Sequence, residues 1–430
     1  MKIINIVKRL YPYDYSVASE GSDKAIQEFK KFLNFKVHKF KTNKKMNGWK
    51  IPQAQKVIRG KILHKNKVIL DSTHSPFHII SQSRSFKGNI TGKELLNNLF
   101  YSNICPQGIP FNWTGLYRPN QNTWGFCVKK KFIKKIKKNE KYFVNLKIKK
   151  LSNPMRVLDF EIKGKSNKTI IINAHNCHKY QANDDISGCS VAIKFFKYLK
   201  TKKNLKYSYR LLIAPELFGP MFWLKKIKHK NIIGAILLKA VGNNNNLKLQ
   251  NSFNSKSIID FAAQNALKKL KINSERGGFR KIYGNDETVF EAPGYSIPSI
   301  TFTRFPFRQY HTDQDKPEII KEKNLIETYN ALKYTVDTIE KNVLISNTHT
   351  GLICLSNKKY DLYMDAFSPG VLKKKYTKNE KNWNLLMNCL PMEVNNNVSI
   401  LDLSKKYNLD FSDVYQYLLK WKKKKLIRFD

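Results

Sequence analysis

Histidines and aspartates gather in one short stretch, I-I-I-N-A-H-N-C-H-K-Y-Q-A-N-D-D-I-S-G, which covers Ile170–Gly188. His175 and His178 follow a run of apolar and β-branched residues that predicts a buried strand. Asp184 and Asp185 lie just before the residues where a helical pattern begins. Proteins of the α/β class present metal ligands in this way, at the carboxyl edge of the sheet. The stretch therefore predicts a metal site.

A glutamate follows a second apolar run, R-L-L-I-A-P-E-L-F-G-P, which covers Arg210–Pro220. The run predicts a strand that ends at Pro215 and places Glu216 at the carboxyl edge of the same sheet. A carboxylate beside a metal is a natural general base, because it can take a proton from water that the metal activates. We therefore expect Glu216 to act as the catalytic base.

Further ligand candidates lie in a third segment, Tyr283–His311. Asp286 lies in a turn rich in Gly and Asn, and His311 follows the predicted strand Ser299–Thr303. Histidine nitrogen and aspartate oxygen hold Zn²⁺ at about 2.0–2.2 Å and leave one position open to water. The metal then lowers the pKa of that water to roughly 7 and polarises a carbonyl group. The donor types thus indicate zinc.

Each of these residues also has a structural explanation. A histidine at the end of a strand more often makes a hydrogen bond than binds a metal, and an aspartate in a turn is usually a turn or cap residue. A glutamate after proline is usually solvated. Cys177 is explained better as a small buried residue than as a ligand. The order of the candidates and their placement after predicted strands nevertheless favour one shared site.

Strands and helices alternate between about residues 151 and 342, which indicates an α/β sheet with helices on both faces. The predicted strands are Thr169–Asn173, Tyr209–Ala214, Ile232–Lys239 and Ser299–Thr303. The predicted helices are Gly188–Lys200, Pro220–Lys228, Ser257–Leu270 and Asn324–Asn342.

The flanking regions have other patterns. Residues 1–35 have helical periodicity, and residues 36–150 alternate in short segments typical of a β-rich module. Near the end, two short amphipathic helices, Ser399–Asn408 and Phe411–Trp421, precede a short strand, which indicates a winged-helix module. We therefore expect a discontinuous domain of residues 1–35 and 151–345, an inserted β-rich domain of residues 36–150, and a C-terminal region of residues 346–430.

Composition limits the classes of function. The chain has 430 residues and no apolar run long enough to span a membrane, and its N-terminus lacks a signal sequence, so we expect a cytoplasmic location. The six cysteines are scattered, as is usual for reduced thiols. The net charge of +47 comes from lysines spread along most of the chain rather than from one basic stripe. This distribution argues against a nucleic-acid partner.

The three segments together resemble the zinc aminopeptidases of family M28. Members have a strand ending in His, an Asp before S-G, a strand ending in Glu, a further Asp, the motif I-P-[AS] and a final His. The more detailed resemblance is to the aminopeptidase-like DUF4910 branch, which has an inserted DUF2172 domain and a C-terminal winged helix. The matching stretches here are A-H-N-C-H-K-Y-Q-A-N-D-D-I-S-G, P-E-L-F-G, G-N-D-E-T-V-F and Q-Y-H-T-D-Q-D.

The resemblance implies a three-layer zinc-peptidase-like α/β fold with a mostly parallel central sheet. It also implies that Glu216 is the general base and that Asp184, Asp286 and His311 bind the metal. The remaining ligand is His175 or His178. Alignment of the strands with the broader family favours His175, whereas the C-H-P motif of the DUF4910 branch favours His178, which we prefer.

Two residues depart from the pattern. The broader family has a second Glu directly after the base, as a ligand of a second zinc ion. Leu217 occupies that position and cannot coordinate, so we expect one zinc ion rather than two. Lys179 replaces the proline of the branch motif, which either loosens the turn or places a cation beside the metal.

Three hypotheses for function follow. The first is a zinc-dependent hydrolase of amide bonds, an aminopeptidase that acts on a small peptide or amide, with Asp185, Glu287 and Tyr310 as candidates for substrate contacts. The second keeps the metal and assigns amidase or deacylase activity on a cell-surface sugar precursor. The third makes the hydrolase domain vestigial and the protein a nucleic-acid- or protein-binding module. The sequence leaves the oligomeric state open, and a homo-oligomer is compatible with it.

Overall fold

The computed structural model describes residues 1–118, 121–363 and 378–430. Its contacts divide the chain into two compact units. The first comprises Met1–Ser255 with Ser274–Tyr329, and the second comprises Lys256–Asn273 with Asn330–Asp430. The predicted domain boundaries at residues 35, 150 and 345 stay predictions. None of the helices in the described part of the chain has both the length and the apolar character needed to cross a bilayer.

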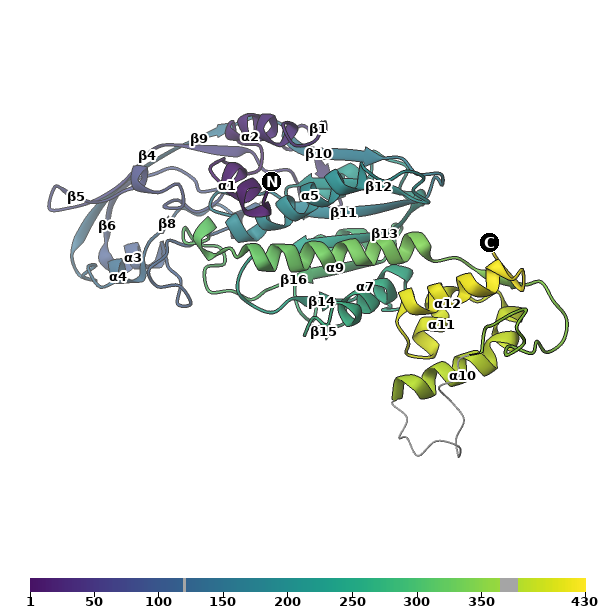
Figure 1. The fold of residues 1–430 in the computed structure, drawn as a ribbon. Coiled ribbons are helices and arrows are strands. Elements are labelled where there is room, and N and C mark those ends of the chain that lie inside the picture. The colour runs from purple at the N-terminus through teal and green to yellow at the C-terminus, as the bar shows by residue number, and fades with distance from the viewer. Residues whose placement is uncertain (119–120, 364–377) are drawn as a thin grey trace. The chain divides into compact units, whose positions relative to one another are not determined.

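An eight-stranded mixed sheet forms the centre of the first unit (Figure 1). Its strands, in spatial order, are β1 (Lys36–Phe40), β10 (Met155–Ile162), β12 (Ser208–Ala214), β11 (Thr169–His175), β13 (Ile232–Lys239), β16 (Ser299–Thr303), β14 (Lys248–Gln250) and β15 (Glu275–Gly277). All four strands that we predicted from the sequence are present, and β13 and β16 have the predicted bounds.

The sheet is mixed, with the expected parallel pairing through its centre and antiparallel pairings beside it. Strands β12, β11, β13 and β16 are parallel, and β14 pairs parallel with β15. The pairings of β1 with β10, β10 with β12, and β14 with β16 are antiparallel. A parallel neighbour needs a crossover of a dozen or more residues. The connection 163–168 joins β10 to β11, and the connection 240–247 joins β13 to β14. Both are too short for such a crossover, so the two strands that each connection joins run in opposite directions.

Helices cover both faces of the parallel strands. Helices α6 (Phe218–Leu224) and α8 (Glu287–Phe290) share one apolar cluster with Ile171 of β11 and Leu237 of β13. Side chains alternate along a strand, so the neighbours of Ile171 point to the opposite face. There α5 (Ser187–Leu199) packs on β11, β12 and β13 and also contacts α1 (Ile3–Leu10). Helix α2 (Gly21–Lys30) contacts α1.

Residues between β1 and β10 form a second sheet within the first unit. Its order is β5 (Lys67–Asp71), β4 (Ala54–His64), β9 (Lys141–Leu151) and β6 (Phe86–Thr91), and every pair is antiparallel. Trp124 is buried in the core of this sheet, where it stacks on Phe86 at 4.3 Å between ring centroids. The smaller elements are β2 (Lys45–Met46), β3 (Trp49–Lys50), α3 (Gly92–Asn97), β7 (Leu99–Phe100), β8 (Phe126–Cys127) and α4 (Lys130–Ile133).

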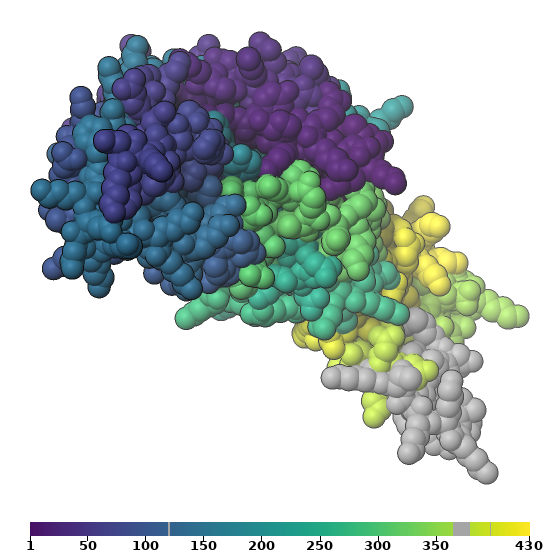
Figure 2. All heavy atoms as spheres, turned by 90° about the vertical axis from the view of Figure 1, so that its left-hand side faces the viewer, coloured from purple at the N-terminus to yellow at the C-terminus, as the bar shows by residue number. Residues whose placement is uncertain are grey.

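This β-rich segment, residues 36–150, lies directly against the segment that follows β16. Figure 2 shows its blue surface in contact with green residues of the later chain. Pro110 forms an isolated β-bridge with Thr312, and Ile109 N donates a hydrogen bond to Asp313 Oδ1 at 2.9 Å. Residues far apart in the sequence therefore form one surface here.

The second unit contains α7 (Ile258–Lys269), the later part of α9 (Glu322–Lys341), α10 (Lys378–Glu393), α11 (Ile400–Lys406) and α12 (Phe411–Lys423). Strands β17 (Ile345–Asn347) and β18 (Ile427–Phe429) pair antiparallel. The two short helices and the final strand lie where the winged-helix prediction expects them, and the assignment itself stays a prediction. Residues 364–377 of the predicted C-terminal region lie outside the described residues.

Candidate functional site

The parallel strands deliver most of the predicted site residues to one edge of the sheet. His175 ends β11, Glu216 follows β12 by two residues, and Lys239 ends β13. The carboxyl ends of parallel strands meet at the same edge, so these side chains converge. The segment after β16 brings His311 to the same place.

Asp184 is the centre of a three-residue group with His178 and His311. Asp184 Oδ2 lies 3.5 Å from His178 Nε2 and 3.2 Å from His311 Nε2. One ligand atom from each residue lies within 4.8 Å of the others. Asp184 has no exposed surface and His178 almost none. Three of the predicted metal ligands are thus brought together.

The unpaired atoms of this group fit a zinc ion. Among the described residues, neither carboxylate oxygen of Asp184 has a hydrogen-bond partner of acceptable geometry, and Nε2 of His178 has none either. The distances are those of ion pairs, but the angles do not suit hydrogen bonds. Burying a carboxylate without partners is costly unless a cation compensates it. Two imidazoles and one carboxylate are a common donor set for zinc.

Asp315 holds the turn that presents Asp184. Its Oδ1 and Oδ2 accept hydrogen bonds from the backbone of Asn183 at 2.7 Å and Asp184 at 3.0 Å. Burial, followed by the charge of Asp184, raises the pKa of Asp315 well above its usual range. We did not pick out Asp315 from the sequence. Its signal is its place at the end of the stretch Q-Y-H-T-D-Q-D.

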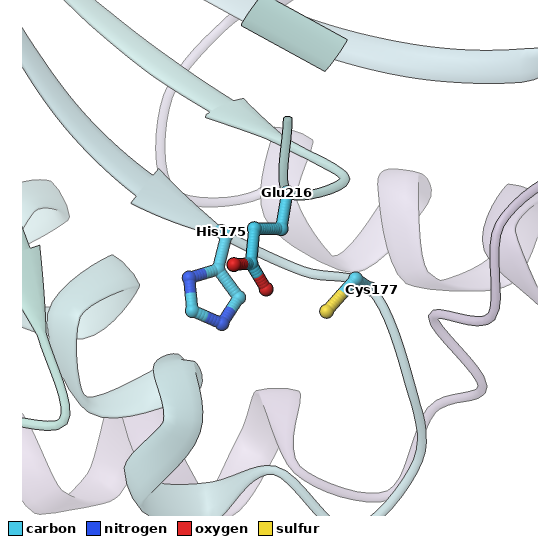
Figure 3. A group of neighbouring side chains, drawn as sticks. All are labelled: His175, Cys177 and Glu216. Carbon is cyan, nitrogen blue, oxygen red and sulfur yellow. The ribbon is translucent and has the colours of Figure 1, made fainter. Parts of the chain in front are cut away.

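Glu216 lies beside the three-residue group in surroundings that suit a base. Burial, followed by the charges of Asp286 and Asp184, raises the pKa of Glu216 well above its usual range. A carboxylate with a raised pKa is a better proton acceptor. Figure 3 shows Glu216, His175 and Cys177 directed into one space beyond the strand ends. Burial also raises the pKa of the Cys177 thiol, and this residue forms with His175 and Glu216 a second group whose ligand atoms lie within 4.8 Å of one another.

Lys239 and Asp286 form a second cluster of charged side chains next to His175. Lys239 Nζ lies 3.0 Å from His175 Nδ1 and 3.3 Å from Asp286 Oδ2. Burial lowers the pKa of Lys239, but nearby carboxylates, first of all Asp286, outweigh burial and raise it above the usual range. The amide of Leu217 donates to Asp286 Oδ1 at 2.7 Å. Asp286 thus lies in the centre as predicted, although both of its oxygens accept from the protein, and its role as a ligand stays a prediction.

Lys239 was missed in the sequence. It follows seven residues without a charge in the strand I-I-G-A-I-L-L-K, and its side chain has no exposed surface. The sequence feature that could have indicated Lys239 is its position at the end of an otherwise uncharged buried strand, because a buried ammonium needs anionic partners.

Asp185 is enclosed by backbone amides. Its Oδ2 accepts from His175 N at 3.2 Å, and its Oδ1 accepts from Ala240 N at 3.0 Å and Gly188 N at 3.2 Å. A Cβ atom at Gly188 would lie 2.4 Å from both Asp185 Oδ1 and Leu238 O, so this close approach requires glycine. These contacts favour a structural role for Asp185 over the substrate contact that we expected.

Glu287 and Tyr310 differ in their access to a substrate. Both carboxylate oxygens of Glu287 accept from Asn285 N at 2.8 Å, and the side chain has no exposed surface, which favours a role in shaping the turn around Asp286. Burial raises the pKa of Glu287 to about 7. Tyr310 is half-buried and stacks on His311 at 3.8 Å between ring centroids. Tyr310 therefore remains a candidate for substrate contact.

The β-rich segment covers the site with aromatic side chains. The ring of Phe111 lies 4.6 Å from that of His178 and 5.6 Å from that of His311, and Phe111 N donates to His311 O at 2.7 Å. His311 has a positive φ of 50°, a conformation that such contacts must hold in place. Trp113 lies at the exposed rim, 6.3 Å from His311 between rings. The segment therefore contributes one wall of the centre.

A cavity of about 380 Å³ adjoins this wall. Cys177, Phe77 and Phe111 line it, and both Phe rings also contact the ring of His178. Neither Glu216 nor any residue of the three-residue group lines it, so the cavity lies beside the metal position rather than over it. It has the volume to hold the part of a substrate away from the reacting bond.

Comparison with known proteins places the chain in a family. The model of DUF4910, described as a domain of unknown function, matches residues 4–342. The chain belongs to the DUF4910 family. A Clostridium acetobutylicum relative, with the provisional name polysaccharide biosynthesis protein with aminopeptidase-like domain, is 25% identical over 346 residues, which are 79% of this DUF4910 chain and 78% of the relative.

Solved structures share the fold of this DUF4910 chain. A provisionally named peptidase from Clostridium acetobutylicum has a TM-score of 0.80 at 21% identity and covers 100% of this chain and 96% of its own. A zinc aminopeptidase from Bacillus subtilis has a TM-score of 0.61 at 15% identity and covers 78% of this chain and 93% of its own. These likenesses confirm an aminopeptidase-like α/β fold.

Proposed function

We propose that the protein is a zinc-dependent hydrolase of amide bonds with an aminopeptidase type of site. The observation that carries the proposal is the group of His178, Asp184 and His311, whose ligand atoms converge around the buried carboxylate of Asp184. The aminopeptidase-like relative and the fold shared with a zinc aminopeptidase support a peptidase-like hydrolase.

Each residue of the site has its own role in the proposed reaction. His178, Asp184 and His311 would hold the zinc ion, which supplies Lewis-acid activation of water and of the substrate carbonyl when bound. Glu216 takes a proton from the attacking water and returns it to the leaving amine, so that the carbonyl carbon–nitrogen bond breaks and an acid and an amine form. Phe111 shields the two histidines from solvent. Tyr310 lies where it can contact the substrate.

A second candidate substrate is an amide on a sugar. The cavity beside the site is lined by five serine and three glutamine side chains, which suit a ligand rich in hydroxyl groups. One of them, Gln55, has a buried Oε1 without a hydrogen-bond partner among the described residues. We therefore keep an amidase or deacylase of a sugar precursor as the alternative to an aminopeptidase.

Metal analysis combined with assays tests the proposal. We expect purified wild type to contain zinc and to cleave either aminoacyl anilides or N-acyl amino sugars, and the preferred class decides between the two substrates. Asp184→Ala should lose zinc and activity. Glu216→Gln should keep zinc and lose at least about 100-fold in turnover, because the base is gone.

Glu275→Gln serves as the matched control, since this glutamate is exposed on β15 and pairs only with Lys248 among the described residues. It should keep both zinc and turnover. Wild type that binds no zinc, or Glu216→Gln that turns over substrate at the wild-type rate, would refute the proposed chemistry.

A further inference from the structure

Lys239 places a cation inside the predicted metal centre. Its side chain has no exposed surface, and its Nζ lies 3.0 Å from His175 Nδ1 and 3.3 Å from Asp286 Oδ2. The residue ends a strand in the middle of the sheet, so the position of its backbone is well fixed. A buried ammonium is tolerated where carboxylates offset its charge. Lys239 thus occupies the space between two residues that the resemblance assigns to the metal.

The ammonium determines which nitrogen of His175 carries the ring proton. A lysine ammonium only donates hydrogen bonds, so His175 Nδ1 must accept, and the proton of the neutral ring is then on Nε2. Nε2 faces Asp184 Oδ1 at 3.0 Å. A ring nitrogen that carries a proton has no lone pair for a metal ion. His175 therefore presents an N–H to Asp184, at ion-pair distance, instead of a lone pair to the metal.

Asp286 also has hydrogen-bond partners within the protein. Lys239 Nζ faces its Oδ2, and the amide of Leu217 donates to its Oδ1 at 2.7 Å. Each oxygen of this carboxylate already accepts a hydrogen bond from the protein. Leu217 stands where the broader family has a metal-binding glutamate, and here its backbone fixes Asp286. The surroundings of Asp286 are therefore complete without a metal ion.

We propose that the ammonium group of Lys239 takes the place of a second metal ion between His175 and Asp286, so that the centre binds a single zinc ion through His178, Asp184 and His311. This inference rests on the proposed zinc chemistry. It assigns His178, from the loop after β11, as the ligand that completes the donor set with Asp184 and His311, and His175 as a positioning residue.

Zinc stoichiometry and a pair of histidine variants test the assignment. Metal-free full-length protein is equilibrated with Zn²⁺, and zinc per folded chain is measured by mass spectrometry, with affinities from chelator competition. We expect one ion per chain in wild type. His178→Ala should lose stoichiometric zinc, weakening binding by more than about 100-fold. His175→Ala should keep one ion and lose about 10–100-fold, as is typical for a residue that orients a ligand.

The lysine itself is tested by Lys239→Ala, with Lys248→Ala on β14 as the matched control. Removing the ammonium leaves His175, Asp184 and Asp286 as donors around an open position, so we expect a second zinc ion in Lys239→Ala and one ion in the control. A zinc-edge anomalous map of wild-type crystals should show one peak, beside Asp184, His178 and His311.

Three results would overturn the inference. They are two zinc ions per wild-type chain, a peak between His175 and Asp286 or beside Cys177, and loss of zinc in His175→Ala but not in His178→Ala. Should Lys239→Ala fail to fold, the wild-type map and the histidine pair decide. Folded Lys239→Ala with one ion also counts against the inference. Wild type without any zinc would instead refute the proposed function, so the two failures are distinguishable.

Discussion

Asp315 is a residue whose effect reaches the metal centre through the backbone. It accepts hydrogen bonds from two consecutive amides of the turn that carries Asp184, and its side chain has no exposed surface. An unpaired donor in the interior costs more than the average hydrogen bond contributes. The position of Asp184 therefore depends on a carboxylate outside the group of His178, Asp184 and His311.

We predict that Asp315→Asn destabilises the protein by about 1–3 kcal/mol and weakens zinc binding by about 10–100-fold, because the amide nitrogen of Asn cannot accept a hydrogen bond from a backbone N–H. Urea unfolding measures the first effect, and chelator competition measures the second. Unchanged zinc affinity in a destabilised variant would show that the turn holds Asp184 without this carboxylate.

Cysteine reactivity is a second prediction at this scale. Cys354 is exposed, and hydrogen bonds from Ser356 and Asn357 lower its pKa, whereas burial raises the pKa of Cys127 to about 12. The thiolate is the reactive form. Iodoacetamide at pH 8 should therefore modify Cys354 first and leave Cys127 intact in native protein. Peptide mass spectrometry checks the order, and equal rates would contradict the burial of Cys127.

The sequence predicted best which residues lie close together where the candidates lie beside predicted strands. His178, Asp184, His311 and Glu216 were found because each follows or precedes a clear apolar run, and the structure brings them together. Lys239 was missed because its role depends on which side chains lie across β11 and β13, which no local pattern shows. Glu287 and Asp185 were proposed as substrate contacts because burial is not visible in a turn sequence.

At the scale of elements, the loop that carries Phe111 positions His311. Backbone hydrogen bonds join the two segments on both sides of His311, since Phe111 N donates to His311 O and Asp313 N donates to Ile109 O. The long separation in sequence hid this pairing, whereas the strands of the parallel core were visible from their apolar runs. The antiparallel strands on both sides of the parallel core were not predicted. The prediction did not take into account that the short connections before and after the core cannot form a parallel crossover.

We predict that Phe111→Ala weakens zinc binding by about 10-fold or more, because the ring packs on both His178 and His311 and its loss admits water and frees their rotation. Phe253→Ala is the matched control, since Phe253 is 67% exposed. Chelator competition on both variants gives the comparison. Equal affinities in the two variants would mean that the aromatic wall does not support the ligands.

At the scale of the whole molecule, the net charge of +47 governs contacts with polyanions. Lysines are spread over most of the chain, so binding to nucleic acid should be electrostatic and independent of sequence. We predict that two unrelated DNA duplexes bind full-length protein equally at about 50 mM salt and are released by about 200 mM salt. Gel shifts across this range test the prediction. A sequence preference that persists at the higher salt would favour a nucleic-acid-binding function.

The β-bridge between Pro110 and Thr312 gives the β-rich segment a role in the candidate site. A chain without the second sheet and its loops would keep β11, β12, β13 and β16 and yet leave His311 without its backbone contact to Phe111. Removing the segment would therefore be expected to disturb both the position of His311 and the core cluster that Ile51 and Ala54 share with α6 and α8. Insertions or deletions in this segment would therefore change the candidate site itself and not only the periphery of the fold.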